Sequence, residues 1–336
     1  MGIQHQGSNI PVCFASCSIP KHYDATLLQK LEAIRKAGFD AIEMSMPDVL
    51  DYGHTITGST VKEDDYDHIA TIAKEIHTFT QQIGIRILML QPFDRFEGWT
   101  GSRHEAQRTA AFRRARGWIQ IMEALGTDML QVGSSDADGI SPSFDVLAAD
   151  LGELADLLAL KGFRLAYENW CWATYAPTWK DIWEILQKAN RPNIGLCLDT
   201  FQTAGGQYGD PTTQSGRIEA VSETELKSCW KRSLEDLQNT IPSDKIYLLQ
   251  ISDAYRMQPP LKTSNQRERA AWSHDYRPLP FHGGYLPIQD VLNSVLRTGF
   301  RSWLSIEVFD SRVETATAME EYTKDAMDSL TQMLNN

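Results

Sequence analysis

The chain has 336 residues, and 32 Lys+Arg against 44 Asp+Glu give it a formal net charge of −12. Charged residues make up 23% and apolar residues 42%, which is typical of a globular protein and excludes wholesale disorder. Nucleic acids and anionic membrane surfaces are bound by clustered Lys and Arg, so the acidic balance argues against both. We therefore expect neither nucleic acid nor a membrane among its partners.

Signals for targeting are absent from the sequence. No basic segment followed by an apolar run occurs in residues 1–15, and no 18-residue apolar run occurs anywhere, so we expect no secretory signal and no membrane span. The five cysteines match no zinc motif and are expected to be reduced. These features predict a cytoplasmic protein, for which a homo-oligomer is possible.

Eight short β-rich segments alternate with eight amphipathic segments along the chain. In chain order, the expected strands are 12–15, 41–45, 85–90, 128–132, 163–168, 194–199, 246–251 and 303–308. The expected helices lie near 24–37, 64–83, 103–125, 142–161, 178–189, 223–239, 287–297 and 315–334. Strict alternation of strand and helix predicts a parallel sheet, and eight such units fit a closed (β/α)8 TIM barrel.

The structural alternative is an open, doubly wound sheet. Such a sheet usually carries a glycine-rich turn after its first strand, whereas residues 16–20 here contain no glycine. We therefore expect a single TIM-barrel domain over residues 1–336. Its long loops, at 200–222 and 252–286, follow strands and should lie on the C-terminal face, where such barrels bind substrates.

Four polar side chains end four consecutive expected strands: Glu168, Asp199, Gln250 and Glu307. Strand alternation puts Asp199 on the face of the small residue Cys197, which suits a crowded barrel interior. Adjacent strands lie about 4.8 Å apart, so these oxygen-bearing groups can converge at one rim. Converging carboxylates repel unless a cation lies among them, and oxygen ligands favour Mg²⁺ or Mn²⁺. The alternative is that such acids merely cap loops and helices.

Several segments resemble a known family. They are MLQPFDRFEG at 89–98, YENWCW at 167–172, NRPNIGLCLDTF at 190–201, QISDA at 250–254, GGYLP at 283–287 and SIEVF at 305–309. This text resembles the xylose-isomerase-like sugar phosphate isomerase/epimerase superfamily, and within it the fungal 3-dehydroshikimate dehydratases. The resemblance implies a TIM barrel in which Glu168, Asp199, Gln250 and Glu307 bind one divalent metal ion. Gln250 matches the dehydratases, whereas many sugar epimerases have His at that position.

The resemblance also implies residues that bind a small-molecule substrate. Ser273 and Arg277 resemble the family's substrate-carboxylate binders, although Arg277 could instead be a solvated loop arginine. Arg95 could line the substrate site or form a salt bridge at its rim. Trp170 could form a wall of that site or pack against a helix.

The catalytic base is where the sequence departs from the family. Fungal dehydratases usually have a His shortly after the Glu that ends the second strand, but Glu43 is followed by none. Bacterial relatives have His at the positions occupied here by Trp170 and Gln202. We expect Glu307 to be the base, with Glu168 as its partner. The alternatives are His274 or His282, in the second long loop, and water.

The function predicted from these features is a metal-dependent dehydratase. It would act through a metal-stabilised enediolate on a polyhydroxylated cyclic keto acid, as in the conversion of 3-dehydroshikimate to protocatechuate. One alternative is a metal-dependent ketose isomerase or epimerase, which would return the proton elsewhere. A second is a barrel that binds a small molecule without catalysis.

Overall fold

Eight parallel strands close into a barrel in the computed structural model, which describes residues 2–313 and 317–336. In barrel order they are β3 (Val12–Ala15), β4 (Ala41–Ser45), β5 (Arg86–Phe93), β6 (Met129–Gly133), β7 (Arg164–Glu168), β8 (Ile194–Asp199), β9 (Ile246–Ile251) and β11 (Trp303–Ile306). Parallel pairing of β11 with both β3 and β9 completes the ring. The (β/α)8 prediction is therefore confirmed, while the extent of a single domain over 1–336 stays a prediction.

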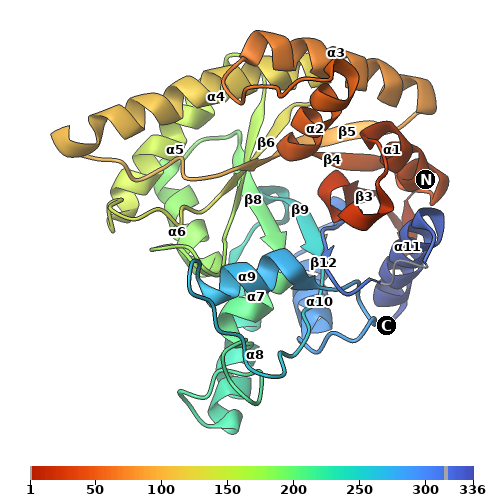
Figure 1. The fold of residues 1–336 in the computed structure, drawn as a ribbon. Coiled ribbons are helices and arrows are strands. Elements are labelled where there is room, and N and C mark those ends of the chain that lie inside the picture. Colours follow the sequence, from red (N-terminus) through yellow and green to blue (C-terminus); the bar gives the residue numbers. More distant parts are fainter. Residues whose placement is uncertain (1, 314–316) are drawn as a thin grey trace.

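Helices surround the barrel (Figure 1). The eight that match the expected ones are α1 (Leu27–Lys36), α3 (Tyr66–Ile83), α4 (Glu105–Leu125), α5 (Phe144–Ala159), α6 (Trp179–Ala189), α8 (Glu223–Thr240), α10 (Ile288–Arg297) and α11 (Met319–Asn335). The first begins later than expected because Thr26 caps it, with its side chain accepting from the Gln29 backbone N–H. The expected start of the last helix, at 315, lies outside the described residues.

Elements that the sequence pattern did not predict lie mostly in the connections. They are the strands β1 (Ile3–His5), β2 (Ser8–Ile10), β10 (Tyr276–Arg277) and β12 (Phe309–Asp310), the helices α2 (Met46–Thr57), α7 (Thr200–Gln207) and α9 (Glu268–Asp275), and the 3₁₀ turns Ser16–Ser18, Lys21–Tyr23, Ser102–His104 and Ser243–Lys245. The regions 200–222 and 252–286 are therefore not loops throughout. In the first of them, Asp199 ends β8 and caps α7 through the Phe201 backbone N–H, so the strand runs directly into a helix.

Two barrel strands differ in length from the prediction. The expected strand 85–90 extends to Phe93, because Gln91 still pairs with Ser45 and Phe93 with Val132. The expected strand 303–308 ends at Ile306, because the Val308 backbone N–H donates to the Ser18 side chain at 2.9 Å.

The core has two separate parts, which confirms the alternation along the strands. Inside the barrel lie Cys13, Ala41, Leu88, Met89, Met129, Ala166, Cys197 and Leu248, all fully buried. Between barrel and helices lies a larger cluster, to which Ile194, Leu196 and Leu198 of β8 belong. Residues of one strand thus alternate between the two parts, and the polar residues at the strand ends follow the inward face.

A buried carboxylate connects two loops at the C-terminal face. Glu97, in the loop after β5, is 1% exposed and accepts hydrogen bonds at 2.8 Å from the Ser135 backbone N–H and the Tyr167 hydroxyl. Both bonds favour the charged carboxylate, yet burial outweighs them and raises the pKa of Glu97 to about 7.

The pKa of Glu97 predicts a pH-dependent contribution to stability. Because the folded state holds this proton more tightly than the unfolded chain, the contribution is fully present below the unfolded pKa and is lost as the pH rises through about 7. Urea unfolding between about pH 5 and about pH 8 should therefore show a shallower loss of stability for Glu97→Gln than for the wild type. Glu32→Gln, at an exposed position, is the control. Parallel stability curves for wild type and Glu97→Gln would refute this assignment.

Candidate active site

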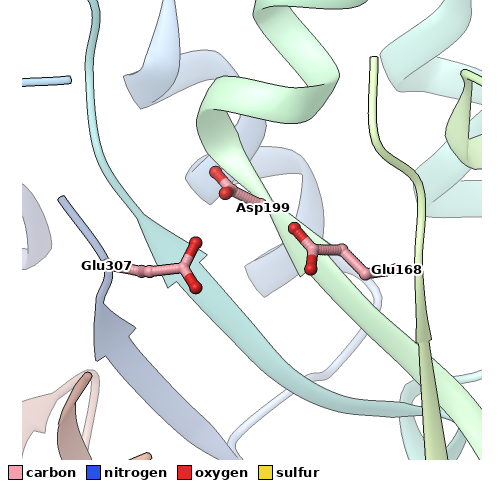
Figure 2. A group of neighbouring side chains, drawn as sticks. All are labelled: Glu168, Asp199 and Glu307. Carbon is pink, nitrogen blue, oxygen red and sulfur yellow. The ribbon is translucent and has the colours of Figure 1, made fainter. Parts of the chain in front are cut away.

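Three buried carboxylates meet at the C-terminal mouth of the barrel. Glu168 ends β7, Asp199 ends β8 and Glu307 follows β11, and each offers an oxygen atom within 4.8 Å of the others. Figure 2 shows the three carboxyl groups turned toward one another. The expected convergence of these three acids is therefore present in the fold.

Glu168, Asp199 and Glu307 together form an acidic triad. Gln250, the fourth expected ligand, lies on β9 beside this triad. It is fully buried and pairs in register with Asp199 on one side and Ser305 on the other. Its amide nitrogen donates to Glu43 Oε2 at 2.8 Å, and its amide oxygen accepts from the Cys197 thiol at 3.2 Å. The hydrogen bonds with Glu43 and Cys197 therefore specify the same orientation of the amide.

Arg277 supplies a positive charge to the triad. The side chain is 1% exposed, so its interpretation as a solvated loop arginine is wrong. Its Nη2 atom donates to Asp199 Oδ2, and to Glu307 Oε2 at 3.1 Å. The arginine lies here because β10, which carries it, pairs with β12 immediately after Glu307.

Further contacts of Arg277 fix its plane. The Ser252 hydroxyl oxygen accepts from Nε at 3.0 Å and from Nη2 at 2.8 Å. Its guanidinium lies over the ring of Phe201, at 4.7 Å from the centroid, and over that of Phe309, at 5.3 Å. Ser273, one turn earlier at the end of α9, accepts a longer hydrogen bond of 3.4 Å from Nη1. The two residues predicted to bind a substrate carboxylate are therefore adjacent.

Electrostatics at the triad is dominated by burial. Burial and then the charges of Glu307 and Asp199 raise the pKa of Glu168 well above its usual value. Burial raises the pKa of Asp199 to about 7, although Arg277 opposes the rise. With all three acids ionised the charge is −3, and Arg277 reduces it to −2. A divalent cation would neutralise the remainder.

The donor set fits such a cation. Hard carboxylate oxygens are the ligands that Mg²⁺ and Mn²⁺ prefer, and the triad brings three of them together. In addition, Glu168 Oε1 is buried and has no hydrogen-bond partner among the described residues. The triad could therefore bind a metal ion.

Three inward-facing polar residues were missed by the sequence reasoning. Gln131 donates to Glu168 Oε2, Gln91 donates to Glu307 Oε1 at 3.1 Å, and Glu43 accepts from Gln250. The signal was available, because alternation puts Glu43 on the face of Ala41 and Gln131 on that of Met129. Burial, followed by the charge of Glu307, raises the pKa of Glu43 to about 8.

Two tryptophan side chains lie next to Glu168. The Trp170 indole N–H donates to Glu168 Oε2 at 3.2 Å, and its ring stacks on Trp172 with centroids 5.1 Å apart. Gly133 makes room for this ring, because a Cβ atom at that position would lie 2.2 Å from it. Trp170 thus contacts Glu168 directly and also packs against the hydrophobic core.

Arg95 forms the rim salt bridge that the sequence left open. Its side chain is 59% exposed, and its Nε atom donates to Asp136 at 2.8 Å. The pair joins the loop after β5 to the loop after β6.

The two loop histidines lie in different surroundings. His274 packs edge-on against Trp172, with centroids 5.5 Å apart, whereas His282 lines a separate cavity with Tyr255 and Arg312. Desolvation by neighbouring side chains and the charge of Arg277 lower the pKa of His274, although the residue is exposed. Of the two, His274 is the one that adjoins the mouth.

Comparison with known proteins identifies the family. Residues 31–333 match the family described as xylose isomerase-like TIM barrel. The chain is 30% identical over 317 residues to a 3-dehydroshikimate dehydratase of Neurospora crassa, covering 90% of this chain and 84% of the fungal one. It is 31% identical over 309 residues to a 3-dehydroshikimate dehydratase of Pseudomonas aeruginosa, but spans 39% of that longer protein and 92% of its own length.

Solved structures agree with this fold. A xylose isomerase-like TIM barrel/4-hydroxyphenylpyruvate dioxygenase fusion protein superimposes with a TM-score of 0.73 at 26% identity, over 96% of this chain and 42% of that one. The IOLI protein, solved with a zinc atom, gives a TM-score of 0.70 at 18% identity, over 97% and 98% of the two chains.

In the described part of the chain, no helix is both long and apolar enough to cross a membrane. Because the curated relatives are enzymes, the expectation of an enzyme is confirmed. The predicted resemblance is also confirmed: the chain belongs to the xylose isomerase-like TIM barrel family.

Proposed function

We propose that the protein is a divalent-metal-dependent dehydratase that acts on a polyhydroxylated cyclic keto acid of the 3-dehydroshikimate type. The observation that carries the proposal is the convergence of Glu168, Asp199 and Glu307 within 4.8 Å, next to the buried Arg277. The name of the fungal relative, which this chain matches over 84% of its length, supports the choice of reaction.

Glu168, Asp199, Gln250 and Glu307 are the proposed ligands of Mn²⁺ or Mg²⁺. The cation would supply Lewis-acid polarisation of the substrate ketone. Asp199 and Glu307 are also the partners of Arg277, so the arginine reduces repulsion among the ligands. With the cation bound these charges would sum to zero, so the site would not repel a substrate carboxylate, and a hard cation favours oxygen-rich ligands.

Substrate binding is assigned to Arg277, Ser273, Trp170 and Arg95. The planar guanidinium and the Ser273 hydroxyl suit the carboxylate of a keto acid. Trp170 offers an aromatic surface beside Glu168. Arg95, paired with Asp136, belongs to the rim, where its charge would attract an acid during approach.

The proton transfers are assigned to Glu307 and Glu168. Glu307 would remove the proton from the carbon next to the ketone, and Glu168 would protonate the β-hydroxyl as it leaves as water. Burial raises the pKa of both carboxyls above the usual value of a glutamate, as is common for acids and bases at active sites. Loss of one water from 3-dehydroshikimate and enolisation of the ketone give the aromatic product protocatechuate.

A metal-dependent ketose isomerase or epimerase is the second candidate. It is favoured by the facing arrangement of Glu168 and Glu307 (Figure 2), which could remove and return a proton. Gln250, together with Ser273 and Arg277, favours the dehydratase. A barrel that only binds its ligand is disfavoured, because burying three acids together is costly without a function for them.

Turnover by the metal-loaded protein tests the proposal. Mn²⁺-loaded protein should convert 3-dehydroshikimate to a product with new aromatic absorbance and leave a panel of ketohexoses unchanged. Asp199→Asn should lose stoichiometric metal and activity together, since the amide keeps an acceptor for the Phe201 N–H but lacks the charge. Interconversion of ketohexoses without any aromatic product would favour the epimerase, and full activity without metal would exclude the proposed chemistry.

Arg277→Lys tests whether the substrate is an acid. An ammonium cannot reproduce the planar fork, so KM for the keto acid should rise about 10-fold to 100-fold, with a smaller change in kcat. Metal content is measured in parallel, because Arg277 also contacts Asp199 and Glu307. An unchanged KM with full metal content would indicate a neutral substrate.

His274→Gln and His282→Gln form a matched pair that tests the base. If Glu307 is the base, both variants should retain kcat within the same order of magnitude across the pH range. His282, in its separate cavity, is the control. A collapse of kcat by several orders of magnitude in His274→Gln alone, at full metal content, would assign the base to His274 instead.

A further inference from the structure

The barrel has one half that carries the proposed ligands and one half that does not. Glu168, Asp199, Gln250 and Glu307 belong to β7, β8, β9 and the end of β11. The strands β4, β5 and β6 contribute no ligand, yet each sends a long polar side chain into the interior. These side chains, Glu43, Gln91 and Gln131, are 0%, 3% and 1% exposed.

Each of the three hydrogen-bonds to a different proposed ligand. Glu43 Oε2 accepts from Gln250 Nε2 at 2.8 Å, Gln91 Nε2 donates to Glu307 Oε1 at 3.1 Å, and Gln131 Nε2 donates to Glu168 Oε2. The first two bonds span the barrel interior between strands that are not neighbours in the ring. Buried polar groups are normally paired, but pairing each with a different ligand is a specific arrangement.

These hydrogen bonds determine which oxygen atoms of the proposed ligands remain free to bind a metal ion. Glu168 Oε2 accepts from both Gln131 and Trp170, whereas its Oε1 has no partner among the described residues. The Gln250 amide could adopt two orientations that differ by a half-turn. Glu43, accepting from its nitrogen, and Cys197, donating to its oxygen, select one of them.

We infer that Glu43, Gln91 and Gln131 are positioning residues that hold Gln250, Glu307 and Glu168 in the orientation that binds a divalent cation. This inference rests on the proposed function, in which those residues are the ligands. Partners of this kind commonly change metal affinity by 10-fold to 100-fold when they are removed.

Metal affinity, measured without turnover, tests the inference. Glu43→Met, Gln91→Met and Gln131→Met remove each hydrogen bond at nearly constant volume, and each should weaken Mn²⁺ binding roughly 10-fold to 100-fold and alter the Mn²⁺ EPR line shape. Gln289→Met is the control, because this half-buried glutamine lies on α10 and bonds to Asn293 and the Met333 carbonyl. Thermal unfolding of each metal-free variant checks that it is folded.

Glu43→Gln separates hydrogen bonding from charge. The amide oxygen introduced by this substitution can still accept from Gln250, so the variant should bind Mn²⁺ nearly as the wild type does and thereby rescue the defect of Glu43→Met. An affinity as low as that of Glu43→Met would overturn the assigned role of Glu43 and indicate that its charge matters instead.

The outcomes distinguish this inference from the proposed function. If the wild type binds one Mn²⁺ and all three Met variants bind it equally well, the positioning role is overturned and the metal site stands. If the folded wild type binds no Mn²⁺, the proposed metal-dependent function is overturned, and the positioning role is overturned with it.

Discussion

The burial of three carboxylates at one point is the constraint on which the site depends. Glu168, Asp199 and Glu307 lie within 4.8 Å of one another and away from water. Charges in such an environment are costly unless opposite charges or hydrogen bonds offset them. Arg277 offsets one charge, and a divalent cation would offset the remaining two. On charge grounds the site could therefore bind a divalent cation.

The geometry of the barrel explains why the three carboxylates converge. Parallel strands end at the same rim, so residues at successive strand ends converge. Alternation sends Asp199 inward together with Cys197, while Leu198 packs against the helices. The connection after β9 then folds back as α9 and β10 and brings Arg277 to the rim.

The barrel and the three acids could be predicted from the sequence, because both depend on short-range sequence patterns. Alternating strand and helix patterns predicted the barrel, and the polar ends of the strands predicted the triad. The short elements α7 and α9, of eight residues each, lie inside long connections where periodicity is too brief to detect. The burial of Arg277 could not be predicted, because it depends on the pairing of β10 with β12, between residues more than thirty positions apart.

Glu43, Gln91 and Gln131 illustrate a different limit. Alternation could have placed Glu43 and Gln131 on the inward face, but their bonds to Gln250 and Glu168 depend on barrel register and closure. Gln91 fell outside the expected strand 85–90, although β5 extends to Phe93. Their partners become visible only in three dimensions.

The most direct test of the account is crystallography of the protein grown with Mn²⁺, using data collected at the manganese absorption edge. If the metal site is as proposed, one strong anomalous peak should lie among Glu168, Asp199 and Glu307, at about 2.0–2.3 Å from their oxygen atoms and from Gln250 Oε1. A well-ordered triad without an anomalous peak, or a peak elsewhere in the protein, would contradict it.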